Sequence, residues 1–270
     1  MGNGKQEMNP IHKTLYIPLY GKAFISKNGI ILQDKKAEEI WEKEGFPLKK
    51  KSKSKWLAYY MGMRSAVFDG WLKEKLQAFP NSMILHLGCG LDSRIERIGT
   101  HSQPFYDVDF PEVIKERKKH FQETSTYQML SADIKNCDFL QEVDHPEISH
   151  AIVLLEGVSM YLENERLQAI FSYLSNRFSH LSVLVDCYTP FAAKMSKIKN
   201  PVREVGVLKV YGVKNPSILE QNTGLTFVTE RSLTPPALID QLHGIERSYF
   251  KKLYAGKISK SLYKLYEFEK

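Results

Sequence analysis

The chain contains the segment Met83-Ile-Leu-His-Leu-Gly-Cys-Gly90, a short apolar run that ends in a glycine turn. An apolar run of this length bounded by glycine is typical of a strand buried in a parallel sheet. Because glycine lets the backbone approach a ligand closely, we expect Gly88, Cys89 and Gly90 to contact a bound cofactor. Ser93 stands where the third glycine of a dinucleotide fingerprint would fall, so a nicotinamide-dependent oxidoreductase is the less favoured alternative.

Strand and helix patterns alternate on both sides of this segment. Strands are expected at 83–87, 104–109, 126–130, 151–155, 181–185, 225–229 and 262–268, and helices at 112–121 and 163–178. This alternation predicts a doubly wound, Rossmann-like α/β fold with a mostly parallel sheet. The last segment alternates apolar and polar residues, which predicts a half-exposed antiparallel edge strand.

The first 75 residues are expected to form a helical cap rather than a separate domain. Asp34 is a good N-cap for a helix over 34–41, and apolar spacing predicts a second helix over 56–76. Residues 15–30 are expected to form a loop that helps to cover the cleft. The sequence shows no linker or internal repeat, so residues 1–270 are expected to form a single domain.

Composition limits the classes of protein to consider. The 270 residues are 43% hydrophobic, enough for a sizeable core, and the sequence contains no apolar run of membrane-spanning length. The polar first residues lead us to expect no secretory signal. Its three cysteines are far apart and lack CxxC spacing, which favours a reducing cytoplasmic location. The eight histidines show no HExxH or similar spacing, so we expect no metal.

Two groups of lysines account for much of the net charge of +7. One is the run at 49–55, and the other comprises Lys251, Lys252, Lys257, Lys260 and Lys264. Solvated surface is the favoured interpretation, and a platform for an anionic partner such as RNA is the alternative.

Acidic residues stand where the next strands end, and ligands of open α/β sheets bind beyond the carboxyl ends of the strands. We expect Asp109 to bind the two hydroxyls of a ribose, with Asp107 on the same strand face as the alternative. Asp133 is a candidate acceptor for an adenine amino group, and Ile134 for covering the adenine face.

Two further charged residues are candidates for the same site. Glu156 ends a wholly apolar strand, and a carboxylate there either faces a cleft or needs a partner, because burying it alone is costly. It is suited to attract a sulfonium or amino group. Arg64 lies near the apolar face of its helix, where it either forms a salt bridge or clamps the carboxylate of a methionine moiety.

The chain shares three characteristic segments with a known family: Leu85-His-Leu-Gly-Cys-Gly-Leu-Asp-Ser-Arg94, Tyr106-Asp-Val-Asp-Phe-Pro-Glu-Val-Ile114 and Leu155-Glu-Gly-Val-Ser-Met-Tyr-Leu162. They resemble the leucine carboxyl methyltransferase family, in particular its bacterial branch of polyketide-synthesis O-methyltransferases. The resemblance implies a class I methyltransferase sheet of seven strands with an antiparallel last strand. It also implies that S-adenosylmethionine (SAM) contacts Arg64, Gly88, Asp109, Asp133, Ile134 and Glu156.

The function that this resemblance implies is transfer of a methyl group from SAM to a carboxylate or hydroxyl, with S-adenosylhomocysteine (SAH) as product. The acceptor is a small molecule or a protein. A carboxylate needs no general base, whereas a hydroxyl does. Tyr161 is expected to line the acceptor pocket. A tRNA-modifying enzyme and a non-catalytic SAM-binding protein remain the alternatives.

Overall fold

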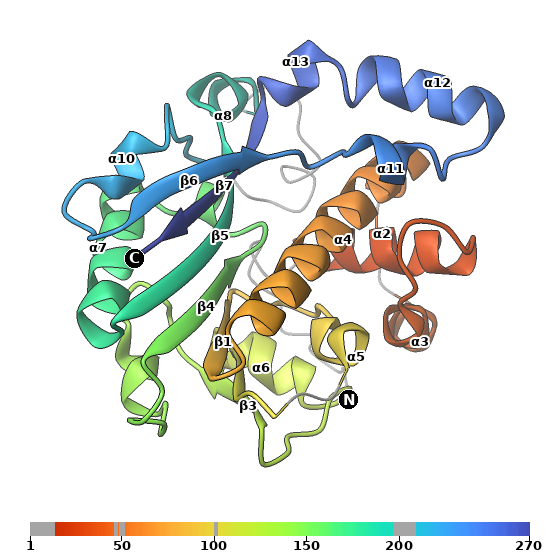
Figure 1. The fold of residues 1–270 in the computed structure, drawn as a ribbon. Helices are drawn as coiled ribbons and strands as arrows, with labels where there is room; N and C mark the ends of the chain where they lie inside the picture. Colours follow the sequence, from red (N-terminus) through yellow and green to blue (C-terminus); the bar gives the residue numbers. More distant parts are fainter. Residues whose placement is uncertain (1–13, 46–47, 49–51, 100–101, 197–208) are drawn as a thin grey trace, which may run out of the picture.

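A computed structural model describes residues 14–45, 48, 52–99, 102–196 and 209–270. A seven-stranded sheet forms its centre, with helices on both faces (Figure 1). The strands are β1 (Ser82–Leu87), β2 (Phe105–Asp109), β3 (Tyr127–Ser131), β4 (His150–Leu155), β5 (His180–Tyr188), β6 (Thr226–Arg231) and β7 (Tyr263–Glu269). The helices are α2 (Tyr16–Lys27), α3 (Lys35–Glu44), α4 (Lys55–Ala78), α5 (Arg94–Ile98), α6 (Pro111–Arg117), α7 (Asn164–Arg177), α8 (Pro190–Ser196), α10 (Ser217–Glu220), α11 (Pro236–Ile239), α12 (Gly244–Leu253) and α13 (Lys257–Lys260), with short 3-10 turns η1 (Asp138–Gln141) and η2 (Ser159–Tyr161).

The strand order is β3-β2-β1-β4-β5-β7-β6. Strands β1 to β5 pair in parallel, whereas β7 is antiparallel to both β5 and β6. The direction of strand succession reverses at β1, which lies between β2 and β4. Because the carboxyl ends of β1, β2 and β4 meet there, this switch point is the expected place for a ligand.

The structure confirms the seven expected strands and the antiparallel direction of the last one, but the edge position predicted for that strand is wrong. Strand β7 lies between β5 and β6, and Phe268 is fully buried. Its charged residue Glu267 is also buried, and it pairs with Lys75 at 2.9 Å and Arg231 at 2.6 Å. Glu267 is therefore accommodated by ion pairs rather than by a solvent-facing position, whereas Lys264 and Glu269 are partly exposed.

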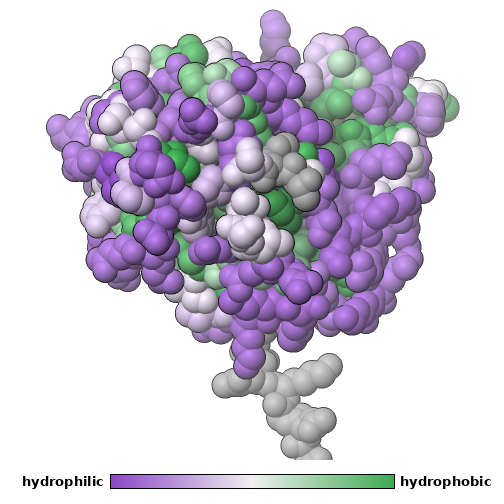
Figure 2. All heavy atoms as spheres, turned by 60° about the horizontal axis from the view of Figure 1, so that its bottom comes forward, coloured by the Kyte–Doolittle hydropathy of each residue, from purple (hydrophilic) through white to green (hydrophobic). Residues whose placement is uncertain are grey.

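Two apolar clusters pack against the two faces of the sheet. On one face, Leu85 and Val153 belong to a cluster with Phe171 of α7. On the other, Ile84 belongs to a cluster with Trp71 of α4 and with residues of α2. Figure 2 shows a face of the molecule on which hydrophilic residues predominate and apolar ones gather in separate patches.

The N-terminal helices lie against the sheet, where α4 crosses its front in Figure 1. The side chain of Asp34 caps α3 by accepting a hydrogen bond from the Ala37 amide at 2.8 Å, as predicted. The loop predicted for residues 15–30 is wrong, because Tyr16–Lys27 forms the helix α2. Pro18 lies in the first turn of α2, where proline is tolerated. The helix predicted over 112–121 is shorter and ends at Arg117.

Within the described residues, no helix combines the length and apolar character that crossing a bilayer requires. Cys89, Cys137 and Cys187 are buried free thiols. Lys49, Lys50 and Lys51 of the basic run lie outside the described residues.

Candidate functional site

Two adjoining cavities lie at the carboxyl ends of β1, β2 and β4. The first has a volume of about 240 Å³ and the second about 110 Å³. Both are lined by Thr14, Leu15, Gly88, Gly157 and Tyr161. Residues of α2 and α4 complete the wall of the first cavity, so the N-terminal section and the sheet form one cleft.

Glycine is required where the two cavities meet. Gly88 and Gly157 have φ values of 70° and 73°, in the left-handed region that other residues rarely adopt. A Cβ atom on Gly88 would come within 2.4 Å of Val158, and one on Gly157 within 3.1 Å of Arg64. A side chain at either position would therefore displace Val158 or Arg64, which line the second and the first cavity respectively.

A buried network of charges lines the first cavity, and Glu156 lies at its centre. Arg64 donates to Glu156 at 3.0 Å, Ser65 donates at 2.7 Å, and Arg94 binds the second carboxylate oxygen. Burial alone would raise the pKa of Glu156, but Arg64 and Arg94 outweigh burial and hold the pKa at about 2. Glu156 is therefore ionised at neutral pH. It both faces the cleft and has charged partners, the two alternatives that its place at the end of an apolar strand suggested.

Arg64 extends the network to β5 and β7. Its Nη1 atom lies 3.3 Å from a carboxylate oxygen of Asp186 and donates to the hydroxyl of Tyr263 at 3.0 Å. Asp186 also accepts a hydrogen bond from the Gly157 amide at 2.8 Å. Burial raises the pKa of Asp186 to about 6, although Arg64 acts in the opposite direction. The salt-bridge interpretation of Arg64 is therefore confirmed, and Arg64 also faces the first cavity.

Lys22 and Asp92 also line the first cavity, and sequence reasoning missed both. Their side chains are nearly fully buried and form an ion pair at 2.8 Å. Asp92 has a second partner in Arg97 at 2.9 Å. Burial would raise the pKa of Asp92, but Arg97, Lys22 and Arg94 hold it well below its usual range. Lys22 was missed because a loop was expected where α2 lies.

The predicted adenosine ligands gather in the second cavity, which Asp109, Asp133 and Ile134 all line. Asp109 accepts hydrogen bonds from the amides of Gly90 and Phe110, both at 2.8 Å. Asp133 lies 3.5 Å from the ammonium of Lys135 and is 30% exposed at its side chain. The structure thus brings together the side chains expected at the ends of two neighbouring strands.

Asp107 has a different environment from Asp109, although the two are on one strand. Asp107 binds Arg117, accepts from the hydroxyl of Tyr127 at 2.6 Å and lies 2.8 Å from the His86 ring. Asp107 lines neither cavity. Its carboxylate is therefore part of a buried ion-pair cluster behind the cleft.

The other predicted residues line the first cavity. Cys89 and Gly90 are there, and burial raises the pKa of the Cys89 thiol. Tyr161 lines both cavities, and burial raises its pKa, so its hydroxyl stays protonated at neutral pH. Tyr60 and Tyr188 add aromatic surface to the first cavity.

Comparisons with known proteins place the chain in a family. A family model described as leucine carboxyl methyltransferase matches residues 6–175. The tetracenomycin polyketide synthesis O-methyltransferase TcmP of Streptomyces glaucescens is 26% identical over 240 residues, which is 88% of each protein. The S-adenosyl-L-methionine-dependent methyltransferase dpfgK of Gibberella zeae is 24% identical over 193 residues, 66% of this chain and 65% of that protein.

A solved structure is similar over nearly the whole chain. It is magnesium protoporphyrin IX methyltransferase (ChlM) from Synechocystis PCC 6803 with bound SAH. The TM-score is 0.51 at 12% sequence identity, and the match covers 96% of this chain and 99% of that one. The likeness confirms the expected class I methyltransferase sheet.

Proposed function

Because the chain belongs to the leucine carboxyl methyltransferase family and is a SAM-dependent methyltransferase, we propose that it methylates an oxygen atom of a small-molecule acceptor. The acceptor oxygen is a carboxylate or an acidic hydroxyl that is already ionised when it binds. The chain's similarity to TcmP, a polyketide synthesis O-methyltransferase, supports oxygen as the acceptor atom.

The cleft has the features that SAM needs. The second cavity would hold adenosine, with Asp109 accepting from the ribose hydroxyls, Asp133 from the adenine amino group and Ile134 against the ring. Gly88 and Gly157 line both cavities, and the rest of the molecule would pass beside them from one cavity to the other.

The methionine end of SAM would then lie in the first cavity. Arg64 and Lys22 would face its carboxylate, and Glu156 its positively charged groups. Cys89 and Gly90 would contribute backbone and surface beside it. In this proposal each charged group of the cofactor meets an opposite charge on the protein.

The main support for an ionised acceptor is that the carboxylates of the first cavity are ion-paired. SAM supplies a methyl group that its sulfonium already activates. Glu156 and Asp92 both line the first cavity, and both are held as ion-paired anions with lowered pKa values, which makes them weak bases. An acceptor that arrives ionised needs no proton removed, so the protein has only to align the oxygen and exclude water.

Aromatic surface indicates the kind of acceptor. Tyr161 lines both cavities, so it lies where the cofactor and the acceptor would meet, while Tyr60 and Tyr188 line the first cavity. We propose that these rings pack against a flat, largely apolar acceptor. The proposal includes a cytoplasmic location, which the buried free thiols support.

The test is an assay with SAM that carries a labelled methyl group. Aromatic carboxylic acids and acidic phenols are offered beside amines of the same skeleton, and products are read by mass spectrometry. Mild base separates the two oxygen products, because it hydrolyses a methyl ester and leaves a methyl ether intact. The proposal predicts label on oxygen with matching release of SAH. Label on nitrogen, carbon or added tRNA would contradict it.

A further inference from the structure

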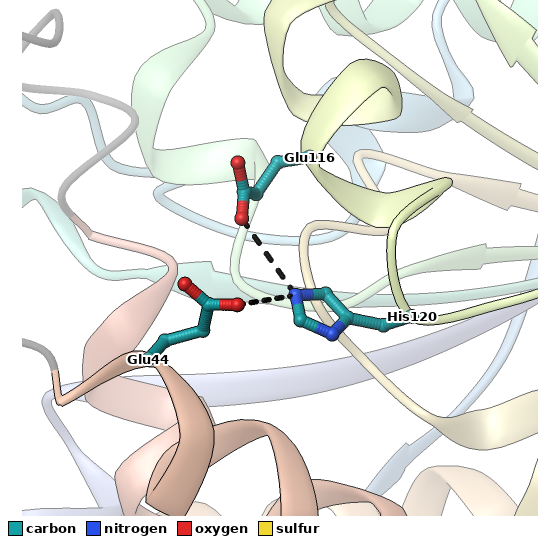
Figure 3. A group of neighbouring side chains, drawn as sticks. All are labelled: Glu44, Glu116 and His120. Atoms are coloured by element: carbon teal, nitrogen blue, oxygen red, sulfur yellow. Dashed lines mark ion pairs between the residues drawn. The ribbon is translucent and has the colours of Figure 1, made fainter.

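Glu44, Glu116 and His120 form a group of potential metal ligands away from the cleft. Glu44 ends α3, Glu116 lies in α6, and His120 follows that helix by three residues. Their ligand atoms all lie within 4.8 Å of one another. Figure 3 shows both carboxylates directed at the same ring nitrogen of His120. None of the three lines either cavity of the cleft.

The distances in this group are too long for hydrogen bonds. Nε2 of His120 lies 3.5 Å from Oε1 of Glu44 and 3.6 Å from Oε1 of Glu116, whereas an N–H···O bond spans about 2.7–3.2 Å. The His120 side chain is 1% exposed, and among the described residues Nε2 has no hydrogen-bond partner. A buried nitrogen therefore faces two carboxylate oxygens without bonding to either.

An ion between these atoms would account for the spacing. Zinc binds imidazole nitrogen and carboxylate oxygen at about 2.0–2.2 Å, so two ligands of a tetrahedral site lie about 3.3–3.6 Å apart. The two measured separations from Nε2 fall in this range. The carboxylates, 26% and 22% exposed at their side chains, leave a route from solvent and room for bound water.

Neighbouring groups do not replace such an ion. Lys119 binds the other oxygen of Glu116, Oε2, and so leaves Oε1 directed at the ring.

We propose that Glu44, Glu116 and His120 bind a divalent first-row transition-metal ion such as Zn²⁺, with water completing the coordination. One nitrogen and two carboxylate oxygens suit such an ion, and the two negative charges balance its charge. The ion ties the end of α3 to the end of α6.

The position of α6 gives the site its expected effect. This helix follows β2 directly, and Phe110 and Val113 at its start line the second cavity. An ion bound near the C-terminal end of α6 would hold α3 against α6, whose first residues line the second cavity. We therefore expect the ion to stabilise the fold and to leave the methyl-transfer chemistry unchanged.

The test is a calorimetric titration of the full chain with ZnCl₂ after removal of metals by a chelator, together with thermal unfolding. The expected result is one equivalent of bound Zn²⁺ and a raised Tm. Glu44→Gln and His120→Gln should each weaken binding at least about tenfold. His145→Gln is the matched control, since His145 lies 3.0 Å from Glu147 at an exposed position, and it should bind as the wild type does.

Two results overturn the proposal. One is that the wild-type chain takes up no Zn²⁺. This result does not depend on the folding of any variant. The other is wild-type affinity in Glu44→Gln, whose partly exposed side chain is replaced by one of the same shape. The visible spectrum of bound Co²⁺ is a second readout, and it should be lost in both ligand variants and kept in the control.

Discussion

The two cavities of the cleft differ in what their carboxylates contact. In the first, Glu156 and Asp92 are ion-paired with buried arginine and lysine side chains. In the second, Asp109 accepts hydrogen bonds from backbone amides. Removing a carboxylate from the first cavity leaves buried cations without their partner, whereas removing Asp109 leaves amides beside a cavity. We therefore expect the first set to govern folding stability and the second to govern cofactor affinity.

The largest effect is expected from Glu156→Gln. The change removes one of the buried carboxylates that balance Arg64 and Arg94, and breaking a buried ion pair costs about 3–5 kcal/mol. Urea unfolding followed by circular dichroism measures the loss. Asp133→Asn is the matched change in the second cavity, where the partly exposed pair with Lys135 contributes at most about 1 kcal/mol. Equal losses in the two variants would remove the distinction between the cavities.

The pH dependence of stability separates two carboxylates of the first network. The folded pKa of Glu156 is about 2, below its usual value, so its stabilisation is present above pH ~4.5 and is lost as the pH falls toward 2. The folded pKa of Asp186 is about 6, above its usual value, so it costs stability as the pH rises from about 4 to 6. The free energy of unfolding should therefore decrease as the pH falls from about 4.5 to 2, and it should also decrease as the pH rises from about 4 to 6. Each slope is at most about 1.4 kcal/mol per pH unit.

Unfolding measured from pH 2 to 8 tests this prediction. Asp186→Asn should flatten the curve between pH 4 and 6, and Glu156→Gln should flatten it below pH 4.5. If both variants show the same pH curve as the wild type over both intervals, groups other than Glu156 and Asp186 govern the pH dependence of stability.

Within one strand, Asp109 and Asp107 should separate binding from stability. Hydrogen bonds to a charged group contribute about 1.5–3 kcal/mol each, so Asp109→Ala should weaken SAM binding about tenfold or more. Asp109→Asn should fall between the alanine variant and the wild type. Asp107→Ala should lower stability instead, because Arg117 loses its buried partner. Titration with SAM after a check of folding measures both, and weaker binding in a stable Asp107→Ala alone would reverse the assignment.

The smallest effect is expected from Tyr161→Phe. Burial keeps its hydroxyl protonated, so this residue is expected to position the acceptor rather than to remove a proton. We expect a rise of a few-fold in KM for the acceptor, with kcat and the Kd for SAM nearly unchanged. Steady-state kinetics measures this once an acceptor is known. A large fall in kcat with KM unchanged would assign the hydroxyl to the chemical step.

The strands and the residues at their ends could be predicted from the sequence because both depend on local signals. An apolar run followed by glycine or aspartate identifies a strand end, and this placed Gly88, Asp109 and Glu156 at the cleft. The pairing partners could not be predicted, since Arg64 reaches Asp186 across 122 positions of sequence. Such contacts follow from the packing of α4 on the sheet, which no local pattern encodes.

The remaining differences have similar causes. Helix α2 was missed because Pro18 and Gly21 argue against a helix, although proline is tolerated in a first turn. The proximity of Glu44 to Glu116 and His120 could not be predicted, because Glu44 lies far along the chain from the other two, which are themselves four residues apart. That spacing alone is too common on helices to indicate a ligand.

The most direct test of the proposed cleft is a crystal structure of the chain with SAH. We expect the adenosine in the second cavity, with both ribose hydroxyls within about 3 Å of the Asp109 carboxylate, and the amino acid end in the first cavity beside Arg64. A complex with the ribose away from Asp109, or with the nucleoside in the first cavity, would contradict it.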